Sequence, residues 1–585
     1  MRVPVEAATS AATHALLNCH AREDERCRLV PAADARGPVA AALTADATHV
    51  LVVPLPSRQA QALAAVTYAS LTGRHRFALP IGLSVAGLDP QPVALHTLAA
   101  MLADELGGGD PSTLLERILD SRAAVAANLR DRAGEIDDLW SAAPLAFGRS
   151  EQALLLGHQL HPTPKSRGEM SPAQRRAYAP EAGAAFPLHW LVVDPAFVRH
   201  ASATGTPAPD LARGLLGEHA PDTGDWVLLP AHPWEARHLQ SDPALHDLFA
   251  SGAVEDLGPL GPPVRPTTSV RTVHHAAWPW QLKFSLHVRV TNSMRVTLPK
   301  ELDRAVEAAR LQQTSLGAAA DAAAPHLRIL HDPAYLTVQR DGEVLSGFSV
   351  LFRENPWPGA PGEDVTAVTT LCQDHPYGGR SRLGAIIDGL AHESGRPPAD
   401  IARAWFARFC DVAVRSLVRL YLDVGLCFEP HQQNTLLELD GGWPARCVVR
   451  DSQGYFHREL AHADVTAVLP GHGEVTESIF PEALADERLV YYPFVNLTLG
   501  VINALGMTGA IDERVLLGDL RDVLSDERAR GGRYPHTLLD RLLDEERWPS
   551  KGNLRTRLHD MDELVGDISV QSVYVSIPNP LRSAA

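Results

Sequence analysis

Cationic and hydroxyl side chains recur in the run Ser269–Arg295, which reads SVRTVHHAAWPWQLKFSLHVRVTNSMR. Two strand-like halves flank a turn predicted at Ala276–Pro279. The second half alternates apolar and polar residues, which is typical of a β-strand with one polar face. That polar face comprises Lys283, Ser285, His287, Arg289 and Thr291, and Arg295 joins it if the strand continues.

The first half of this run carries Ser269, Arg271 and Val273 on one face. Folding the halves together places Arg271 near Lys283. A polyphosphate needs such a surface, because arginine makes forked contacts with phosphate and lysine supplies a point charge. The competing interpretation is a solvated outer face of an antiparallel sheet, where lysine and arginine are common.

A second polar group surrounds a hairpin predicted from strands near Thr435–Leu439 and Ala445–Arg450, joined at Asp440-Gly441-Gly442. Asn434 precedes the first strand and Asp451 follows the second, so the hairpin brings both together. Their oxygens are the hard ligands that suit Mg²⁺ on nucleotide phosphates. The same loop holds Glu429, His431 and Gln433, with His431 a candidate general base or substrate contact. Alternatively, Asn, Asp and Gln simply form turns here.

A third group is the loop Gly157–Arg167, GHQLHPTPKSR, in which proline stiffens the backbone. It offers His158, His161, Lys165 and Arg167 to an anionic ligand. No third ligand of comparable quality follows the two histidines, so a metal pair is not favoured. A proline-rich surface connection would have a similar composition.

These groups require a large folded scaffold. The chain has 585 residues, which exceeds the ~250–300 residues of a single core and predicts two or three domains. We expect a supporting domain at 1–130, a β-rich domain at 131–350, and a mainly helical domain at 351–585 that contains the second hairpin. In the last, 402–424 is predicted to be one helix ending at Gly425.

The overall charge limits the possible partners. A formal net charge of −17 argues against nucleic acid and against an anionic membrane surface. The six cysteines form no CxxC pair, which favours reduced thiols. The sequence shows no leader peptide and no run of ~18 apolar residues, so we expect a cytoplasmic protein.

The ordered motifs resemble the NRPS-independent siderophore synthetases of the aerobactin-synthetase type. The likeness extends from about Gly157 to Asp451, and no P-loop or GxGxxG fingerprint competes with it. It rests on GHQLHPTPKSR, AHPWE at Ala231–Glu235, TSVRT at Thr268–Thr272, KFSLHVRVTNSMR at Lys283–Arg295, EPHQQN at Glu429–Asn434 and Arg450-Asp451, with PNPL at Pro578–Leu581 near the end.

This resemblance implies an α+β, cupped-hand fold of thumb, fingers and palm with antiparallel sheets, and a homodimer. It also implies ATP- and Mg²⁺-dependent formation of an acyl-adenylate, followed by attack of an amine or hydroxyl. Carried over by motif, the residues expected to contact the nucleotide phosphates are Ser269, Arg271, Lys283, Arg295, Lys165 and His158. The residues expected to face the carboxylic substrate are Thr291, Arg295, His431 and His158, and Glu429 is expected in the same pocket. The residues expected to bind the nucleotide and Mg²⁺ are Gln433, Asn434 and Asp451.

The sequence constrains the identity of the carboxylic acid less than it constrains the type of reaction. We favour citrate, because a compact tricarboxylate fits a pocket rich in arginine, histidine and threonine. A citrate monoamide or a succinyl-hydroxamate would use the same chemistry. Two other classes stay open, namely a kinase-like phosphotransferase that yields ADP and a binding protein without turnover.

Overall fold

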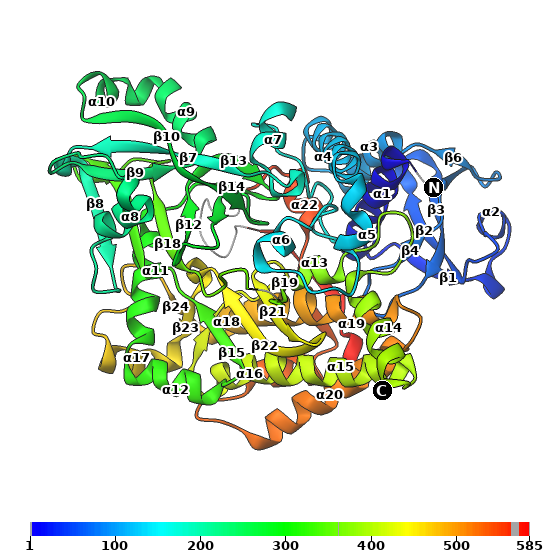
Figure 1. The fold of residues 1–585 in the computed structure, drawn as a ribbon. Coiled ribbons are helices and arrows are strands. Elements are labelled where there is room, and N and C mark those ends of the chain that lie inside the picture. The colour runs from blue at the N-terminus through cyan, green and yellow to red at the C-terminus, as the bar shows by residue number, and fades with distance from the viewer. Residues whose placement is uncertain (1–2, 361, 563–571, 584–585) are drawn as a thin grey trace.

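The computed structural model describes residues 3–360, 362–562 and 572–583. Helices and mostly antiparallel sheets alternate along the chain, and the predicted α+β class is confirmed. In Figure 1 the amino-terminal segment lies at the upper right and the middle segment at the upper left. The carboxyl-terminal segment fills the lower half.

The amino-terminal segment packs helices on a twisted antiparallel sheet ordered β1-β2-β3-β5-β6, with β4 on β3. Its strands are β1 (Arg28–Pro31), β2 (His49–Leu55), β3 (Ala60–Tyr68), β4 (Arg76–Phe77), β5 (Ile81–Val85) and β6 (Gln91–Val93). Its helices are α1 (Pro4–Glu23), α2 (Pro38–Ala41), α3 (Leu95–Leu106) and α4 (Pro111–Asp131). Most of the apolar run HVLVVP is buried because it forms the interior strand β2, which pairs with β1 and β3.

The middle segment is built on a nine-stranded sheet ordered β17-β16-β18-β12-β11-β10-β7-β9, with β8 on β16. These strands are β7 (Phe186–Val193), β8 (Val198–Ser202), β9 (Val227–Ala231), β10 (Val254–Pro266), β11 (Thr272–His274), β12 (Trp280–Phe284), β16 (Ala334–Arg340), β17 (Glu343–Val344) and β18 (Val350–Glu354). A separate hairpin, β13 (Leu286–Val290) and β14 (Ser293–Arg295), leaves this sheet after β12.

The helices of the middle segment are α5 (Ile136–Leu139), α6 (Phe147–Glu151), α7 (Pro172–Tyr178), α8 (Ala208–Leu216), α9 (Pro233–Ser241), α10 (His246–Ala250), α11 (Pro299–Gln312) and α12 (Ser315–Ala323). His232 begins α9 by accepting a hydrogen bond from the Trp234 amide. The Trp234 side chain is buried in the core.

The carboxyl-terminal segment is mainly helical, as expected, but it holds more strands than the one predicted hairpin. That hairpin, β21 (Thr435–Asp440) and β22 (Trp443–Arg450), joins β15 (Leu327–Leu330) and β19 (Val365–Ala367). The other strands are β20 (Leu426–Cys427), β23 (Phe456–Arg458), β24 (Ile479–Phe480), β25 (Arg547–Lys551) and β26 (Tyr574–Pro578). Two pairs, β15 with β22 and β23 with β24, are parallel.

The helices of this segment are α13 (Val368–Cys372), α14 (Arg382–Ser394), α15 (Pro398–Phe409), α16 (Ser416–Arg419), α17 (His462–Val468), α18 (Glu482–Leu489), α19 (Leu499–Gly506), α20 (Glu513–Arg530), α21 (Thr537–Asp544), α22 (Asn553–Leu558) and α23 (Pro580–Ser583). α15 continues through α16 to residue 424, with wider π-type turns at 410–415 and 420–424. Gly425 ends it as predicted, at φ 74°, and a Cβ there would lie 2.4 Å from the Ala461 Cβ.

Three large hydrophobic cores follow the three predicted parts only approximately. Leu554 of α22 belongs to the amino-terminal core, since α22 packs on α1 and α4 at the top of Figure 1. Ala308 and Ala320 of the middle segment belong to the carboxyl-terminal core. The boundaries at residues 130 and 350 therefore stay a prediction, and each segment shares core residues with a neighbour.

One helical stretch, Glu482–Gly506, is long and apolar enough to cross a membrane by length and composition. The sequence-based expectation that the chain contains no such stretch is therefore not met by this criterion. However, 94% of its apolar window is buried inside the molecule. Its middle part, 490–498, winds as a π-helix around Pro493, and such irregular turns recur at functional sites.

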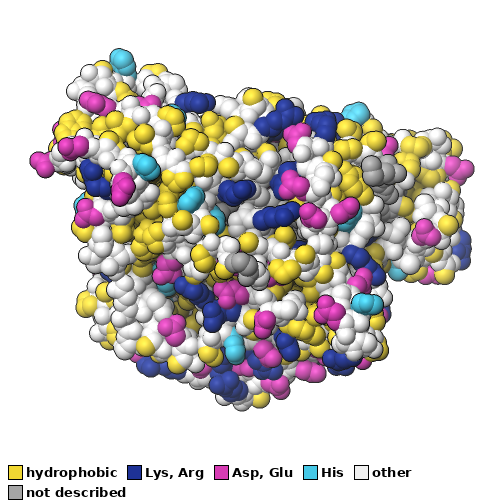
Figure 2. All heavy atoms as spheres, in the orientation of Figure 1, with side chains coloured by type: hydrophobic (Ala, Val, Ile, Leu, Met, Phe, Trp, Pro, Cys, Tyr) yellow, Lys and Arg dark blue, Asp and Glu magenta, His cyan; other side chains and the backbone are white. Residues whose placement is uncertain are grey.

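The distribution of charged side chains on the surface and the state of the cysteines agree with what the composition predicts. On the face drawn in Figure 2, Lys and Arg side chains are interspersed with Asp and Glu, and no broad basic surface forms there. All six cysteines are free, and five of them are buried.

Candidate active site

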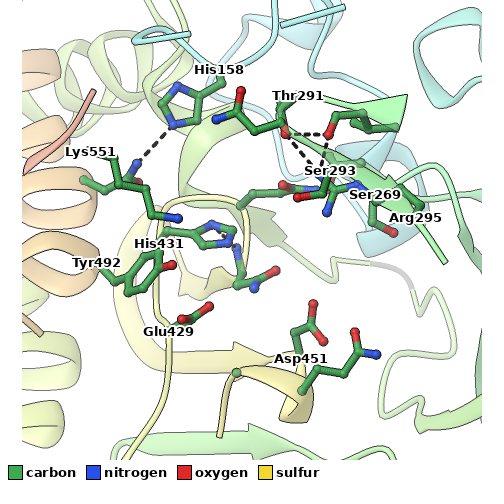
Figure 3. A pocket seen from close by; sticks show the side chains of 18 of the residues that line it. His158, Ser269, Thr291, Ser293, Arg295, Glu429, His431, Asp451, Tyr492 and Lys551 are labelled. Carbon is green, nitrogen blue, oxygen red and sulfur yellow. Dashed lines mark hydrogen bonds between the residues drawn. The ribbon is translucent and has the colours of Figure 1, made fainter. Parts of the chain in front are cut away.

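One cavity of about 310 Å³ gathers residues from the middle and carboxyl-terminal segments of the chain. Figure 3 looks into it, with Tyr492 and Lys551 on one flank and Ser269 and Arg295 on the other. Eleven of the twelve predicted site residues line it: His158, Lys165, Ser269, Arg271, Thr291, Arg295, Glu429, His431, Gln433, Asn434 and Asp451. Lys283 is the exception and lies directly behind the wall.

Ser269 and Arg271 sit in a tight turn between β10 and β11, and the prediction of a strand there was wrong. Val270 has φ 70°, which reverses the chain, and the Thr272 amide donates to Ser269 Oγ at 3.2 Å. The strand begins only at Thr272, which pairs with Lys283. The predicted closeness of Arg271 and Lys283 is nevertheless confirmed, because the chain enters β11 directly after Arg271.

Lys283, Arg271 and Gln453 form a buried network behind the cavity. Gln453 Oε1 accepts from Arg271 Nη2 at 2.9 Å and from Lys283 Nζ. Lys283 is 1% exposed, which excludes a solvated outer face at this position. Burial lowers the pKa of Lys283 to about 8, although Asp451 opposes that shift.

Asp451 is the carboxylate partner of this network. Its Oδ1 pairs with Lys283 Nζ and lies 3.6 Å from Arg353 Nη2. Burial alone would raise the pKa of Asp451, but Lys283, Arg353 and Arg271 outweigh burial and hold it well below its usual range. Among the described residues, no hydrogen bond engages its second oxygen, Oδ2. One carboxylate oxygen is therefore available to a ligand.

Arg295 reaches the cavity by a different route from the predicted one. The strand does not continue past Val290; the chain reverses at Thr291, with φ 57°, and Arg295 returns on β14. Arg295 Nη2 donates to Thr291 Oγ1 at 3.0 Å and to the Val290 carbonyl at 2.7 Å. The hairpin thus presents the Thr291 hydroxyl and the Arg295 guanidinium together.

The rest of the predicted polar face does not reach the cavity, because the chain leaves the large sheet after β12 and forms the separate hairpin of β13 and β14. His287 Nδ1 pairs with Glu235 at 2.5 Å. Arg289 Nη1 lies 3.4 Å from Asp560. Neither residue lines the cavity.

The second hairpin forms as predicted and brings Asn434 and Asp451 together. The Arg450 amide donates to the Asn434 carbonyl at 3.0 Å, and Thr435 pairs with Val449. Gly441 and Gly442 take φ 52° and 81° in the connecting turn. The Asn434 side chain has no recorded hydrogen bond with the described residues. An amide oxygen and one carboxylate oxygen at adjacent strand ends fit a divalent cation that keeps other oxygen ligands.

His431 and Glu429 lie on the Tyr492 and Lys551 side of the cavity (Figure 3). Burial, with smaller contributions from His158, Lys551 and Arg295, lowers the pKa of His431 to about 3. A neutral imidazole of such low basicity is better suited to hydrogen bonding than to proton abstraction. Burial raises the pKa of Glu429, and Lys551 and Arg488 partly offset that shift.

The loop 157–167 has no regular secondary structure and closes one side of the cavity. His158 Nε2 lies 3.0 Å from Asn496 Nδ2, and His161 Nε2 lies 2.9 Å from Asn292 Oδ1. Lys165 and Arg167 both pair with the buried Glu181. The two predicted anion contacts thus already share a carboxylate, which reduces the net charge they offer.

Sequence reasoning missed several lining residues, among them Arg488, Tyr491, Tyr492, Asn496 and Lys551. Lys551 Nζ lies 5.2 Å from the Tyr492 ring centroid and 5.9 Å from that of Tyr491. The available signal was the pair of tyrosines beside Pro493, an unusual sequence inside a helix. That stretch is otherwise apolar enough to be taken for core.

Comparison with known proteins gives consistent matches along the chain. A model of the IucA / IucC family matches residues 146–373. A model described as ferric iron reductase FhuF-like transporter matches residues 403–566. The rhizobactin siderophore biosynthesis protein RhbC of Rhizobium meliloti is 39% identical over 88% of this chain and 89% of its own.

Two further relatives and one solved structure support the same grouping. The spermidine-citrate ligase of Bacillus anthracis is 32% identical over 88% of each chain. The N(2)-citryl-N(6)-acetyl-N(6)-hydroxylysine synthase of Escherichia coli is 31% identical over 91% of this chain and 93% of its own. The ATP-bound aerobactin synthetase IucA of Klebsiella pneumoniae superposes with a TM-score of 0.86 at 29% identity, covering 98% of this chain and 99% of that one.

Proposed function

The chain belongs to the IucA/IucC family of siderophore-forming ligases, and on that premise we propose that it uses ATP and Mg²⁺ to join citrate to an amine. Relatives named as citrate ligases, and a structural neighbour solved with ATP, support this choice of substrates. The observation that carries the proposal is the cavity itself. Its walls bring phosphate-binding cations and metal-binding oxygens into one space that is also lined by Arg488 and Lys551.

The two ends of the cavity suit two different anions. Arg271 and Arg295, with Lys283 behind them, suit the phosphates of the nucleotide. Arg488, Lys551 and the neutral His431 suit the carboxylates of a small acid. Thr291 and Arg295 lie where both anions would meet, because the hairpin turn holds them together.

The residues present fit one Mg²⁺ ion, which Asn434 and the Oδ2 atom of Asp451 would hold. When bound, the ion supplies positive charge that offsets repulsion between the carboxylate and the phosphates. Lys283 holds Oδ1 of the same carboxylate, which orients Oδ2. Because that lysine and Arg353 already neutralise much of the Asp451 charge, we expect the ion to arrive with the nucleotide rather than bind tightly alone.

In the first step a citrate carboxylate oxygen attacks the α-phosphorus, the bond from that phosphorus to the bridging oxygen breaks, and pyrophosphate leaves. The neighbouring cations stabilise the charge that accumulates on the phosphorus oxygens. In the second step the amine nitrogen attacks the acyl carbon and loses its proton, and AMP leaves with the former carboxylate oxygen. The product is an amide, and the Arg295 side of the cavity serves both steps.

A panel of acids tests this proposal. The protein is incubated with ATP, Mg²⁺, hydroxylamine as surrogate nucleophile, and citrate, succinate or a citrate monoamide in turn. We expect pyrophosphate, AMP and a hydroxamate with citrate. Hydroxamate formed only from the monoamide would show that the substrate is a citrate that has already been condensed once.

A kinase-like phosphotransferase is the second candidate, because Asn434 and Asp451 stand at hairpin ends as metal ligands do in protein kinases. That layout is an analogy alone. Release of ADP in place of AMP in the same assay would favour it.

Two further expectations belong to this proposal, namely a homodimer and a cytoplasmic location. Sedimentation of the purified chain would give twice the monomer mass for a dimer. Cell fractionation would place the chain in the soluble fraction.

A further inference from the structure

A second cavity lies behind the loop that carries His158. It measures about 70 Å³ and shares Gly157, His158 and Pro164 with the main cavity. The amino-terminal segment supplies much of its lining, including α1, the end of β4 and α4. This segment, which was predicted to be a supporting domain, therefore reaches the rear of the active site.

The lining of the second cavity is positively charged. It contains Arg74, Arg76 and Arg122 but, among the described residues, a single carboxylate, Asp374. Asp374 Oδ2 is already paired with Arg74 Nη2 at 2.5 Å. The remaining two arginines give an excess of two positive charges in a protein whose net charge is −17.

Arg76 and Arg122 are half-buried, and neither side chain forms an ion pair or hydrogen bond with another described residue. The Arg122 Nε atom is buried without a hydrogen-bond partner. Arg74 and Arg76 both lower the pKa of Asp374, so this one carboxylate lies near both of them and balances a single charge. Half-burial of the Arg76 and Arg122 guanidinium groups removes part of their hydration, and the protein compensates for it incompletely. Two such groups on one cavity indicate a site that an anion completes.

His14, which also lines this cavity, does not provide that anion with further charge. His14 donates from Nδ1 to the Ser10 carbonyl at 2.7 Å and accepts the Phe77 amide at Nε2, at 3.0 Å. Burial lowers the pKa of His14 to about 4, so it is neutral near pH 7. The recognition therefore rests on the two arginines, which fit the forked geometry of phosphate or carboxylate.

A third cavity of about 320 Å³ shares Arg76, Asp374, His375 and Gly378 with the second. Its remaining lining includes Arg380, Ser381 and Met507. The three cavities thus follow one another from the active site past the His158 loop. Because Arg76 lines both the second and the third cavity, an anion held by Arg76 has additional room on the side of the third cavity.

We propose that Arg76 and Arg122 form a second binding site for a small oxyanion, next to the main cavity and separated from it by the His158 loop. Two sources share this chemistry. One is the pyrophosphate released in the first step, and the other is a carboxylate on the amine acceptor. Only the origin of the anion rests on the proposed function, since binding itself requires no turnover.

Calorimetry on the full chain tests this site, with the main cavity saturated by a non-hydrolysable ATP analogue. The probes are sodium pyrophosphate, L-lysine, and cadaverine, which is L-lysine without its carboxylate. We expect the wild-type chain to bind pyrophosphate, or L-lysine in preference to cadaverine. Which of these binds identifies the source of the anion. If neither pyrophosphate nor L-lysine binds, the proposal is overturned.

The charge-neutral double variant Arg76→Gln/Arg122→Gln provides the comparison. Two lost charge-assisted contacts should weaken the anion about 10-fold or more. Arg130→Gln, on the exposed face of α4, is the matched control and should bind as the wild type does. Equal affinity in the double variant would exclude these arginines.

A measurement without variants covers the case in which the double variant does not fold. Wild-type crystals soaked in selenate should show an anomalous peak between the Arg76 and Arg122 guanidinium groups. Selenate found only in the main cavity would overturn the proposal.

Discussion

The ammonium group of Lys283 is ion-paired with the carboxylate of Asp451, although 167 residues separate them in the sequence. Lys283 comes from the sheet of the middle segment and Asp451 from the end of the second hairpin. The contact therefore joins the proposed phosphate end of the cavity to the proposed metal site. It also makes Lys283 a structural residue as well as a candidate catalytic one.

This pair predicts a stability cost that the sequence alone did not suggest. Lys283→Met should lower the free energy of unfolding by about 3 kcal/mol, because it leaves Asp451 without its nearest cation. Asp451→Asn should restore part of that loss in the double variant. Urea unfolding of both single variants and the double variant measures the coupling. Strictly additive losses would mean that the two charges do not depend on each other.

Arg295→Ala should reduce kcat about 10²–10³-fold, because it removes a preorganised cation from the proposed reacting centre. Arg289→Ala is the control, since Arg289 lies on the same hairpin but faces Asp560 outside the cavity. Steady-state assays of AMP release compare the two. Near-normal kcat in Arg295→Ala would remove it from the site.

Asn434→Ala should shift the free Mg²⁺ concentration for half-maximal rate upward, since it deletes one proposed oxygen ligand. Asp440→Asn, at the exposed far end of the same hairpin, should leave it unchanged. The rate is measured against free Mg²⁺ at fixed ATP. An unshifted dependence in Asn434→Ala would place the metal elsewhere.

Gly425→Ala should destabilise the fold by about 2 kcal/mol or more. The residue has φ 74°, and the new Cβ would meet Ala461. Gly134→Ala is the control, because nothing lies within 4 Å of a Cβ at that position. Thermal melts compare the two, and equal melting temperatures would show that the helix end can rearrange.

The His287–Glu235 pair predicts a pH dependence of stability. The hydrogen bond that His287 donates to the Glu235 carboxylate raises the pKa of His287 above its usual value. A raised folded-state pKa means that this stabilisation is complete below about pH 6.5 and is lost as the pH rises through the folded value. His287→Gln should flatten that part of the stability profile, whereas the exposed His200→Gln should not. An unchanged profile in His287→Gln would assign the dependence to other groups.

Local patterns predicted much of this molecule. The hairpin 435–450 follows from a glycine turn between two apolar runs, and the helix ending at Gly425 follows from its apolar periodicity. The same reasoning failed where the backbone turns without glycine. Val270 and Thr291 both take positive φ, so the predicted strands break there.

Long-range partners could not be read from the sequence. Nothing near Lys165 indicates that Glu181 neutralises it, and nothing near Lys283 indicates Asp451. Tyr492 resembles a core residue because its helix is buried, yet it also lines the cavity. The resemblance of the ordered motifs to a known family located the site, because such motifs carry information about contacts between residues that are distant in the sequence.

The most direct test of the account follows oxygen atoms. Citrate carrying ¹⁸O in its carboxylates is incubated with ATP, Mg²⁺, a reactive amine and the protein, and the nucleotide products are analysed by mass spectrometry. Attack on the α-phosphorus predicts AMP that carries one ¹⁸O atom, with unlabelled pyrophosphate. Unlabelled ADP together with ¹⁸O-labelled inorganic phosphate would contradict adenylation and show phosphoryl transfer instead.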